Sequence, residues 1–117
     1  MPGIHRFKRI GSTQERAKLL AEQGAPEGTI VRADRQTRGR GRFKRRWESP
    51  EGGLWFSMVL YPAIDPARAW QLTMVCAVAL AAGIRKGAGI RVGLKWPNDI
   101  VYKTKKVGGI LTETSAA

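Results

Sequence analysis

The chain has 117 residues, of which 43% are hydrophobic and 26% charged, an ordinary composition for a soluble protein of one domain. Its net charge of +12 favours an anionic partner, either nucleic acid, a phosphate-bearing ligand or an acidic protein. A single cysteine, Cys76, excludes an intramolecular disulfide, and no apolar core of signal-peptide length opens the sequence, so we expect a cytoplasmic protein.

The first third of the sequence predicts two strands around one helix. Apolar residues between basic ones predict a short strand over residues 4–10, and a β-rich run predicts another over residues 29–33. Ser12 begins the helix and Gly24 stops it. Ser12 and Glu15 fit a capping box, in which both side chains satisfy free amides at the helix start.

The middle of the sequence predicts a long polar loop, a strand and an apolar helix. Residues 36–53 form the loop, and a loop of this length in a small domain is usually functional or disordered. The strand covers residues 54–61, and the helix opens at Asp65 and Pro66. Its apolar stretch, residues 69–84, is too short and too interrupted to span a bilayer, so we expect a buried helix ended by Gly83, Gly87 and Gly89.

Three more strands are predicted near the end of the sequence, over residues 90–96, 100–102 and 107–112. Turns at 97–99 and 103–106 separate them, and the last two strands form a hairpin. The whole pattern predicts an α+β fold with a mixed, mainly antiparallel sheet and helices packed on one side.

The strongest candidate for chemistry lies in the polar loop, where glycines and arginines alternate over residues 38–42. Alternate glycines let the backbone approach a ligand, and arginines supply planar cationic donors for carboxylate or phosphate. The same pattern also fits a disordered basic loop or an RNA-binding arginine-glycine tract.

Three further motifs are weaker when each is taken alone. Lys-Trp-Pro-Asn-Asp at 95–99 fits an ordinary turn, and Lys-Val-Gly-Gly at 106–109 fits a solvated hairpin edge. A lysine close to Gly-Gly could also bring a charge and bare backbone to one anion. The hydroxyls of Ser12 and Thr13 could cap the helix, bind a ligand, or do both.

These motifs occur in an order and spacing that together resemble the biotin protein ligase family. They are Ser-Thr at 12–13, Gln-Thr-Arg-Gly-Arg-Gly-Arg at 36–42 followed by Trp47, Lys-Trp-Pro-Asn-Asp, and Lys-Val-Gly-Gly-Ile-Leu at 106–111. The resemblance extends from about Ile10 to Glu113. It implies the fold that biotin ligases share with class II aminoacyl-tRNA synthetases.

The resemblance implies an enzyme that joins biotin and ATP into biotinyl-5′-AMP and then transfers biotin to a lysine of a biotin carboxyl carrier protein. Two anions must meet in the first step, so fixed cations and backbone amides suit it. Mg²⁺ is expected to arrive on the ATP phosphates, without a dedicated protein metal site. By position, the resemblance implies biotin contacts from Ser12, Thr13, Gln14, Gln36, Gly39, Arg40, Gly41, Arg42, Lys106 and Gly109, nucleotide contacts from Arg40, Arg42, Trp47, Asn98 and Lys106, and catalytic roles for Lys106, Arg40 and Asp99.

The sequence departs from the family pattern in three ways. Gln14 stands where the family usually has Asn, and Lys44 stands where it often has Gly. The resemblance also implies a further Gly-x-Gly-x-Asn strand and a small C-terminal β-domain, and neither is in this sequence. We therefore expect residues 1–117 to be the N-terminal portion of the catalytic domain.

Two alternatives to a complete ligase follow from these features. One is a catalytically incomplete biotin-binding fragment that forms a homodimer or binds a complementing C-terminal chain through an open sheet edge. The other is a small basic nucleic-acid-binding protein, which would interleave stacking aromatics with its cations, whereas the loop offers only Phe43 and Trp47. We expect neither a specific nucleic acid nor a membrane as partner.

Overall fold

The computed structural model describes residues 2–115. The chain divides into two compact units, Met1–Ala63 and Ile64–Ala117, each with its own sheet and helices. The predicted α+β class is confirmed, with the strands arranged in two three-stranded sheets.

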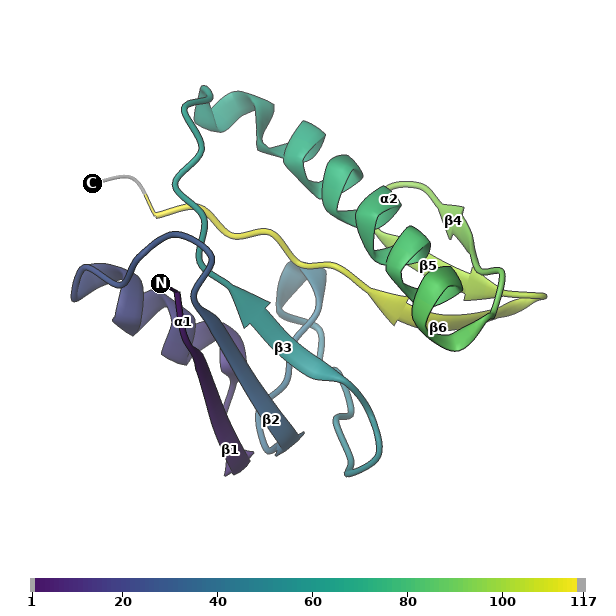
Figure 1. Cartoon of the computed structure of the whole chain (residues 1–117), viewed down its shortest axis with the longest axis horizontal. Helices are drawn as coiled ribbons and strands as arrows, with labels where there is room; N and C mark the ends of the chain where they lie inside the picture. Colours follow the sequence, from purple (N-terminus) through teal and green to yellow (C-terminus); the bar gives the residue numbers. More distant parts are fainter. Residues whose placement is uncertain (1, 116–117) are drawn as a thin grey trace. The chain divides into compact units, whose positions relative to one another are not determined.

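The first unit holds a mixed sheet in the order β1-β2-β3 (Figure 1). Strand β1 (Ile4–Ile10) pairs in parallel with β2 (Ile30–Gln36), and β2 pairs antiparallel with β3 (Trp55–Met58). Parallel neighbours need a crossover connection, and α1 (Thr13–Glu22) provides it. The predicted elements of this unit are therefore present, with β2 longer than expected and β3 shorter than the strand expected over residues 54–61.

Helix α1 packs on one face of this sheet through a small apolar core. Ala17, Val31 and Val59 are buried together there, with Phe7 and Leu20 among the partly buried residues against them. At the start of α1, the Ser12 hydroxyl accepts hydrogen bonds from the amides of Gln14 and Glu15, as a helix cap does.

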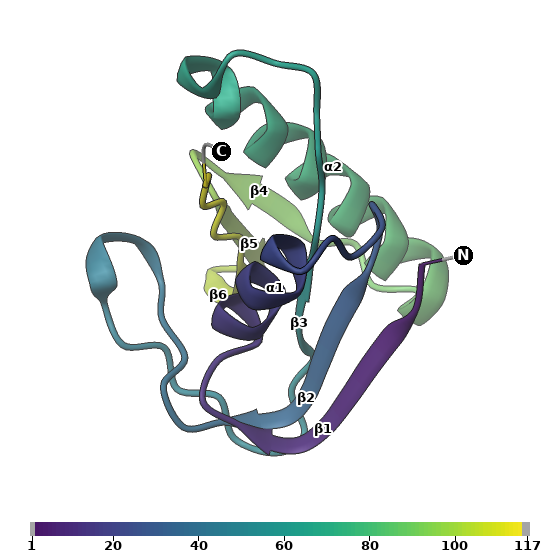
Figure 2. The ribbon, with the colours of Figure 1, turned by 90° about the vertical axis from the view of Figure 1, so that its left-hand side faces the viewer.

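The polar connection between β2 and β3 folds back on itself instead of running as an open loop. Gly41 N donates to the Arg45 carbonyl at 2.7 Å, and Trp47 N donates to the Gly39 carbonyl at 2.9 Å. A single 3₁₀ turn, η1 (Arg42–Lys44), forms the tip. Figure 2 shows this segment extending away from the sheet as a narrow arm. We call residues 38–47 the arginine arm.

The second unit holds an antiparallel sheet in the order β4-β5-β6 beside one long helix. The strands are β4 (Gly93–Lys95), β5 (Asp99–Tyr102) and β6 (Lys105–Gly109). The predicted hairpin of the last two strands is confirmed, whereas β4 covers only part of the strand expected over residues 90–96. Strand β6 begins two residues earlier and ends three residues earlier than the strand expected over residues 107–112. A 3₁₀ turn, η2 (Pro66–Arg68), is capped by the Asp65 carboxylate and leads into helix α2 (Ala69–Ala88).

Helix α2 differs from the prediction in both length and burial. Gly83 and Gly87 do not end it, and it runs to Ala88, where Gly89 adopts a left-handed φ of 69°. Within the described chain α2 buries only Ala77, so the expectation of a buried helix is wrong.

The added length also bears on the prediction that this helix is too short to cross a membrane. Residues Pro66–Ala88 are long and apolar enough to cross a membrane by length and composition, contrary to the prediction. Core helices of soluble proteins can have the same length and composition, so this property alone assigns no location. Cys76 is only half-buried on this helix, and burial raises the pKa of its thiol.

Candidate functional site

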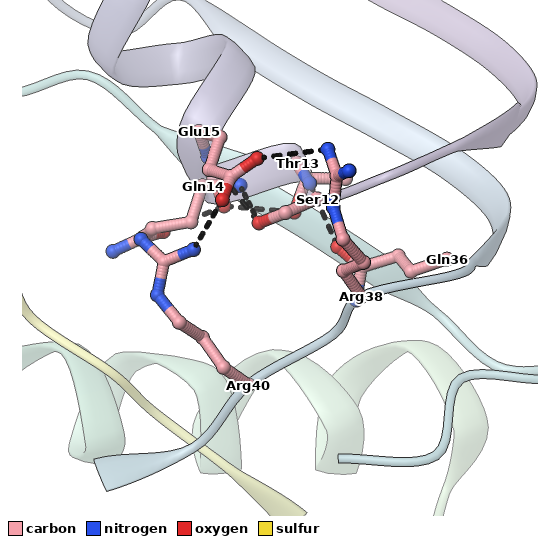
Figure 3. Close-up of polar contacts among 8 residues, drawn as sticks. Ser12, Thr13, Gln14, Glu15, Gln36, Arg38 and Arg40 are labelled. Atoms are coloured by element: carbon pink, nitrogen blue, oxygen red, sulfur yellow. Dashed lines mark hydrogen bonds and ion pairs between the residues drawn. The ribbon is translucent and has the colours of Figure 1, made fainter. Parts of the chain in front are cut away.

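Residues predicted to hold biotin meet where α1 begins. Ser12 and Thr13 are both buried there, at 3% and 4% exposure. The Gln36 side chain, at the end of β2, accepts a hydrogen bond from the Thr13 amide at 2.7 Å (Figure 3). A free amide at the helix start is thus satisfied by a residue 23 positions away.

The other end of the Gln36 amide holds the base of the arginine arm. Gln36 Nε2 donates to Ser49 Oγ at 3.0 Å, and Ser49 Oγ donates to the Trp47 carbonyl at 3.1 Å. Gly39 fills the space between these groups. A Cβ on Gly39 would lie 2.7 Å from the Trp47 carbonyl oxygen and would also collide with Ser49, so only glycine fits here.

Gln14, the first departure from the family pattern, takes part in a buried hydroxyl network. Ser57 Oγ donates to Gln14 Oε1 at 2.7 Å and lies 2.9 Å from Thr13 Oγ1. Ser57 projects from β3, so this network ties the start of α1 to the far strand of the sheet. The side chain of Gln14 reaches this strand directly.

Two arginines of the arm converge on one carboxylate of α1. Arg38 Nη2 and Arg40 Nη1 each lie 3.3 Å from an oxygen of Glu15 (Figure 3). Arg40 is the more enclosed of the two, with 20% of its side chain exposed against 72% for Arg38. Only the Ser12 half of the predicted capping box is therefore formed, because the Glu15 carboxylate pairs with the arginines instead.

At the tip of the arm, Lys44 has a backbone conformation that is unfavourable for a residue other than glycine. Phe43 and Lys44 both have φ near 60°, a left-handed conformation that side chains with a Cβ disfavour. Glycine adopts this conformation freely, so a glycine in place of Lys44 would relax the turn. Arg42 lies over the Phe43 ring, 4.9 Å from its centroid.

In the second unit, Asp99 and Lys106 form an ion pair of 2.8 Å across β5 and β6. Asp99 pairs in register with Gly109 and Val101 pairs with Lys106, with a register shift between them. Without this bulge, Lys106 and Gly109 would lie on opposite faces of β6, because side chains alternate along a strand. The bulge places Lys106 on the face of Asp99, and its side chain passes along Gly109, whose Cβ would lie 3.6 Å from Lys106 Cε.

Asn98 fixes the turn that precedes β5. Its side-chain amide donates to the Ile110 carbonyl at 2.9 Å, and its own carbonyl accepts from Ile110 N at 3.0 Å. The turn and the end of β6 are thereby tied together, beside the Asp99–Lys106 pair.

The predicted site residues thus form two groups, one in each unit. The first comprises Ser12, Thr13, Gln14, Gln36, Gly39, Arg40, Gly41, Arg42 and Trp47, and the second comprises Asn98, Asp99, Lys106 and Gly109. Sequence reasoning missed Ser49 and Ser57, which hold Gln36 and Gln14, and it missed the pairing of Glu15. The alternation of side chains along β3 puts Ser57 on the buried face of the strand. A serine at a buried strand position is a weak signal from which its role could have been predicted. Among the described residues, no group of three or more His, Cys, Asp or Glu side chains could hold a metal ion.

Comparison with known proteins places this geometry in a family. The model of the "Biotin/lipoate A/B protein ligase family" matches residues 6–116. The chain is 53% identical to the bifunctional ligase/repressor BirA of Bacillus spizizenii over 92% of its length, and 40% identical to the biotin--[acetyl-CoA-carboxylase] ligase of Paracoccus denitrificans over 93%.

Solved structures agree with these relatives. The biotin protein ligase of Aquifex aeolicus in complex with biotin and ATP superposes on 98% of this chain with a TM-score of 0.85 at 41% identity. The Leishmania major ligase in complex with biotinyl-5-AMP superposes with a TM-score of 0.84 at 30% identity. The chain spans 33% of the Bacillus protein, 46% of the Paracoccus protein and about half of each solved chain. Together, the matched motifs, the fold and the family model show that this chain belongs to the biotin/lipoate A/B protein ligase family.

Proposed function

We propose that these residues bind biotin and take part in its activation by ATP to biotinyl-5′-AMP, the step before its transfer to a lysine of a biotin carboxyl carrier protein. The observation that carries the proposal is the joining of the start of α1, Gln36 and the arginine arm into one hydrogen-bonded group. A small polar head with an anionic tail, such as biotin, fits hydroxyls and an amide at one end and arginines at the other.

Adenylation requires side chains that supply positive charge and hold the two substrates in position. In adenylation, an oxygen of the biotin carboxylate attacks the α-phosphorus of ATP, and the bond from that phosphorus to the pyrophosphate oxygen breaks. Biotin is itself the nucleophile, so the protein needs none. Arg40, Arg42 and Lys106 are the cations that we assign to the carboxylate and the phosphate.

The remaining site residues are assigned to the other parts of the ligand. We assign the ureido ring of biotin to Ser12, Thr13, Gln14 and Gln36, the nucleotide to Trp47 and Asn98, and the bare backbone of Gly39, Gly41 and Gly109 to close approach of the ligand. Asp99 orients Lys106 through their ion pair. Mg²⁺ would be held mainly by ATP phosphates, because the described residues offer no carboxylate cage for it.

The chain spans only part of its relatives, so complete turnover by residues 1–117 is a separate question from ligand binding. We propose that residues supplied by a second copy or by a complementing chain are needed for turnover. We also place the protein in the cytoplasm, acting on a carrier protein. A pyrophosphate-exchange assay, with and without the C-terminal half of a relative as a separate polypeptide, tests the need for complementation.

Calorimetry distinguishes this function from nucleic-acid binding. We expect saturable binding of biotin, and tighter binding of biotinyl-AMP, by the purified chain. RNA binding through about six phosphates would lose on the order of 10³ in affinity between 50 and 200 mM salt. Salt-resistant RNA binding without any affinity for biotin or biotinyl-AMP would refute the proposal.

A further inference from the structure

The side chain of Glu15 has no role in the proposed function, yet its carboxylate contacts two arginines of the arginine arm. Its backbone amide belongs to the helix cap, and its carboxylate lies 3.3 Å from both Arg38 and Arg40. Figure 3 shows the two guanidinium groups reaching this carboxylate from separate points of the chain.

The geometry allows one carboxylate to hold both arginines. Arg38 and Arg40 are two positions apart at the base of the arm, and both side chains reach the same carboxylate. The backbone of Arg38 is held in place, because its N–H donates to the Gly11 carbonyl at 2.8 Å. Gly11 leaves room for the Arg38 guanidinium, which occupies the space that a Cβ at position 11 would need.

The charges in the arm make such an anchor necessary. Residues 38–46 carry Arg38, Arg40, Arg42, Lys44, Arg45 and Arg46 without an acidic residue among them. Mutual repulsion of these cations would keep Arg38 and Arg40 apart, and the Glu15 carboxylate opposes this for these two arginines. A guanidinium carries five N–H donors, more than a contact with one carboxylate oxygen uses.

We propose that Glu15 is a positioning residue, whose carboxylate holds Arg38 and Arg40 against the start of α1 so that Arg40 is in place when the anionic end of biotin or of its adenylate arrives. This inference rests on the proposed function for the identity of the ligand, but the anchoring itself does not depend on it. The ligand then meets an arm that is already ordered at its base, and less of the binding free energy is spent on ordering it.

Calorimetry with biotinyl-AMP tests the role of Glu15 in binding. Glu15→Gln keeps the size of the side chain and its backbone amide but removes the charge, and we expect it to weaken binding about five-fold. Glu22→Gln, the matched control at the other end of α1, should change binding less than about two-fold. Glu15→Asp should recover part of the affinity, and the urea midpoint of every variant should stay near that of the parent chain.

A double variant separates positioning from an independent effect. If Glu15 acts through Arg40, then Glu15→Gln with Arg40→Ala should bind no more weakly than Arg40→Ala alone. Effects that multiply, or binding by Glu15→Gln that equals or exceeds that of the parent, would overturn the proposal.

Limited trypsin digestion of the ligand-free chain keeps this test distinct from that of the proposed function. Glu15→Gln should speed cleavage after Arg40 and Arg42 by about three-fold or more, and Glu22→Gln should not. If the parent chain failed to bind biotinyl-AMP, the ligand assignment would fall, and the digestion alone would decide the anchoring. Equal digestion rates in the two variants would then overturn it.

Discussion

The most direct test of the arginine arm is the substitution Gly39→Ala. The new Cβ would lie 2.7 Å from the Trp47 carbonyl oxygen and 2.9 Å from Gln36 Nε2, and it would also collide with Ser49 Oγ. The carbonyl is backbone, and the nearby hydrogen bond from Trp47 N to the Gly39 carbonyl limits its movement. Overpacking of a filled site destabilises by about 1–3 kcal/mol, and a lost hydrogen bond adds about 1 kcal/mol. We therefore expect the free energy of unfolding to fall by about 2–4 kcal/mol.

Urea denaturation followed by tryptophan fluorescence measures this loss, provided that the slope with urea stays constant. Gly41→Ala is the matched control in the same arm, because the nearest atoms would lie 3.9 Å from its Cβ. That variant should remain within about 0.5 kcal/mol of the parent or be slightly more stable, since alanine lowers the entropy of the unfolded chain. A Gly39→Ala variant as stable as Gly41→Ala would show that the arm is not packed as described.

Three further predictions concern Lys106, Lys44 and the peptide bonds of the arginine arm. In an active ligase carrying these residues, Lys106→Ala should slow adenylate formation by roughly 10²–10³, whereas Lys105→Ala should do much less, and equal effects would mean that bulk charge matters more than position. Lys44→Gly should raise the free energy of unfolding by about 0.5–1 kcal/mol in urea, because it releases a left-handed turn, and Lys44→Ala, which keeps a Cβ there, should not. Saturating biotinyl-AMP should protect the bonds after Arg40, Arg42 and Arg45 from trypsin, and unchanged cleavage would count against ordering of the arm by ligand.

Local chemistry made much of the fold predictable from sequence. The apolar residues between basic ones in β1, the serine cap of α1 and the glycine after α2 each shape the chain within a few positions of themselves. The hairpin of β5 and β6 is also a local structure. Burial of α2 could not be predicted in this way, because it depends on what packs against the helix and not on its own composition.

The candidate site was predictable by residue type but not by its connections. Gln36 and Thr13 could be named from their motifs, yet the hydrogen bond between them joins positions far apart in sequence. Ser49 and Ser57 are single small residues without a motif, and only the folded chain shows what they hold. The bulge that turns Lys106 toward Asp99 is a one-residue register shift, which no pattern of two glycines specifies.

The net charge of +12 illustrates how structure changes the meaning of composition. Taken alone, it favours nucleic acid, because a basic surface attracts any polyanion. In the folded chain, Arg38 and Arg40 pair with Glu15, Arg46 pairs with Glu48, and Lys106 pairs with Asp99. Arg40 and Lys106 are the more enclosed of these cations, and a cation in a defined position suits a small anion of defined shape better than a flexible phosphate backbone. The pairing of Arg38 and Arg40 with Glu15 therefore supports the proposed carboxylate or adenylate ligand over an RNA-binding tract.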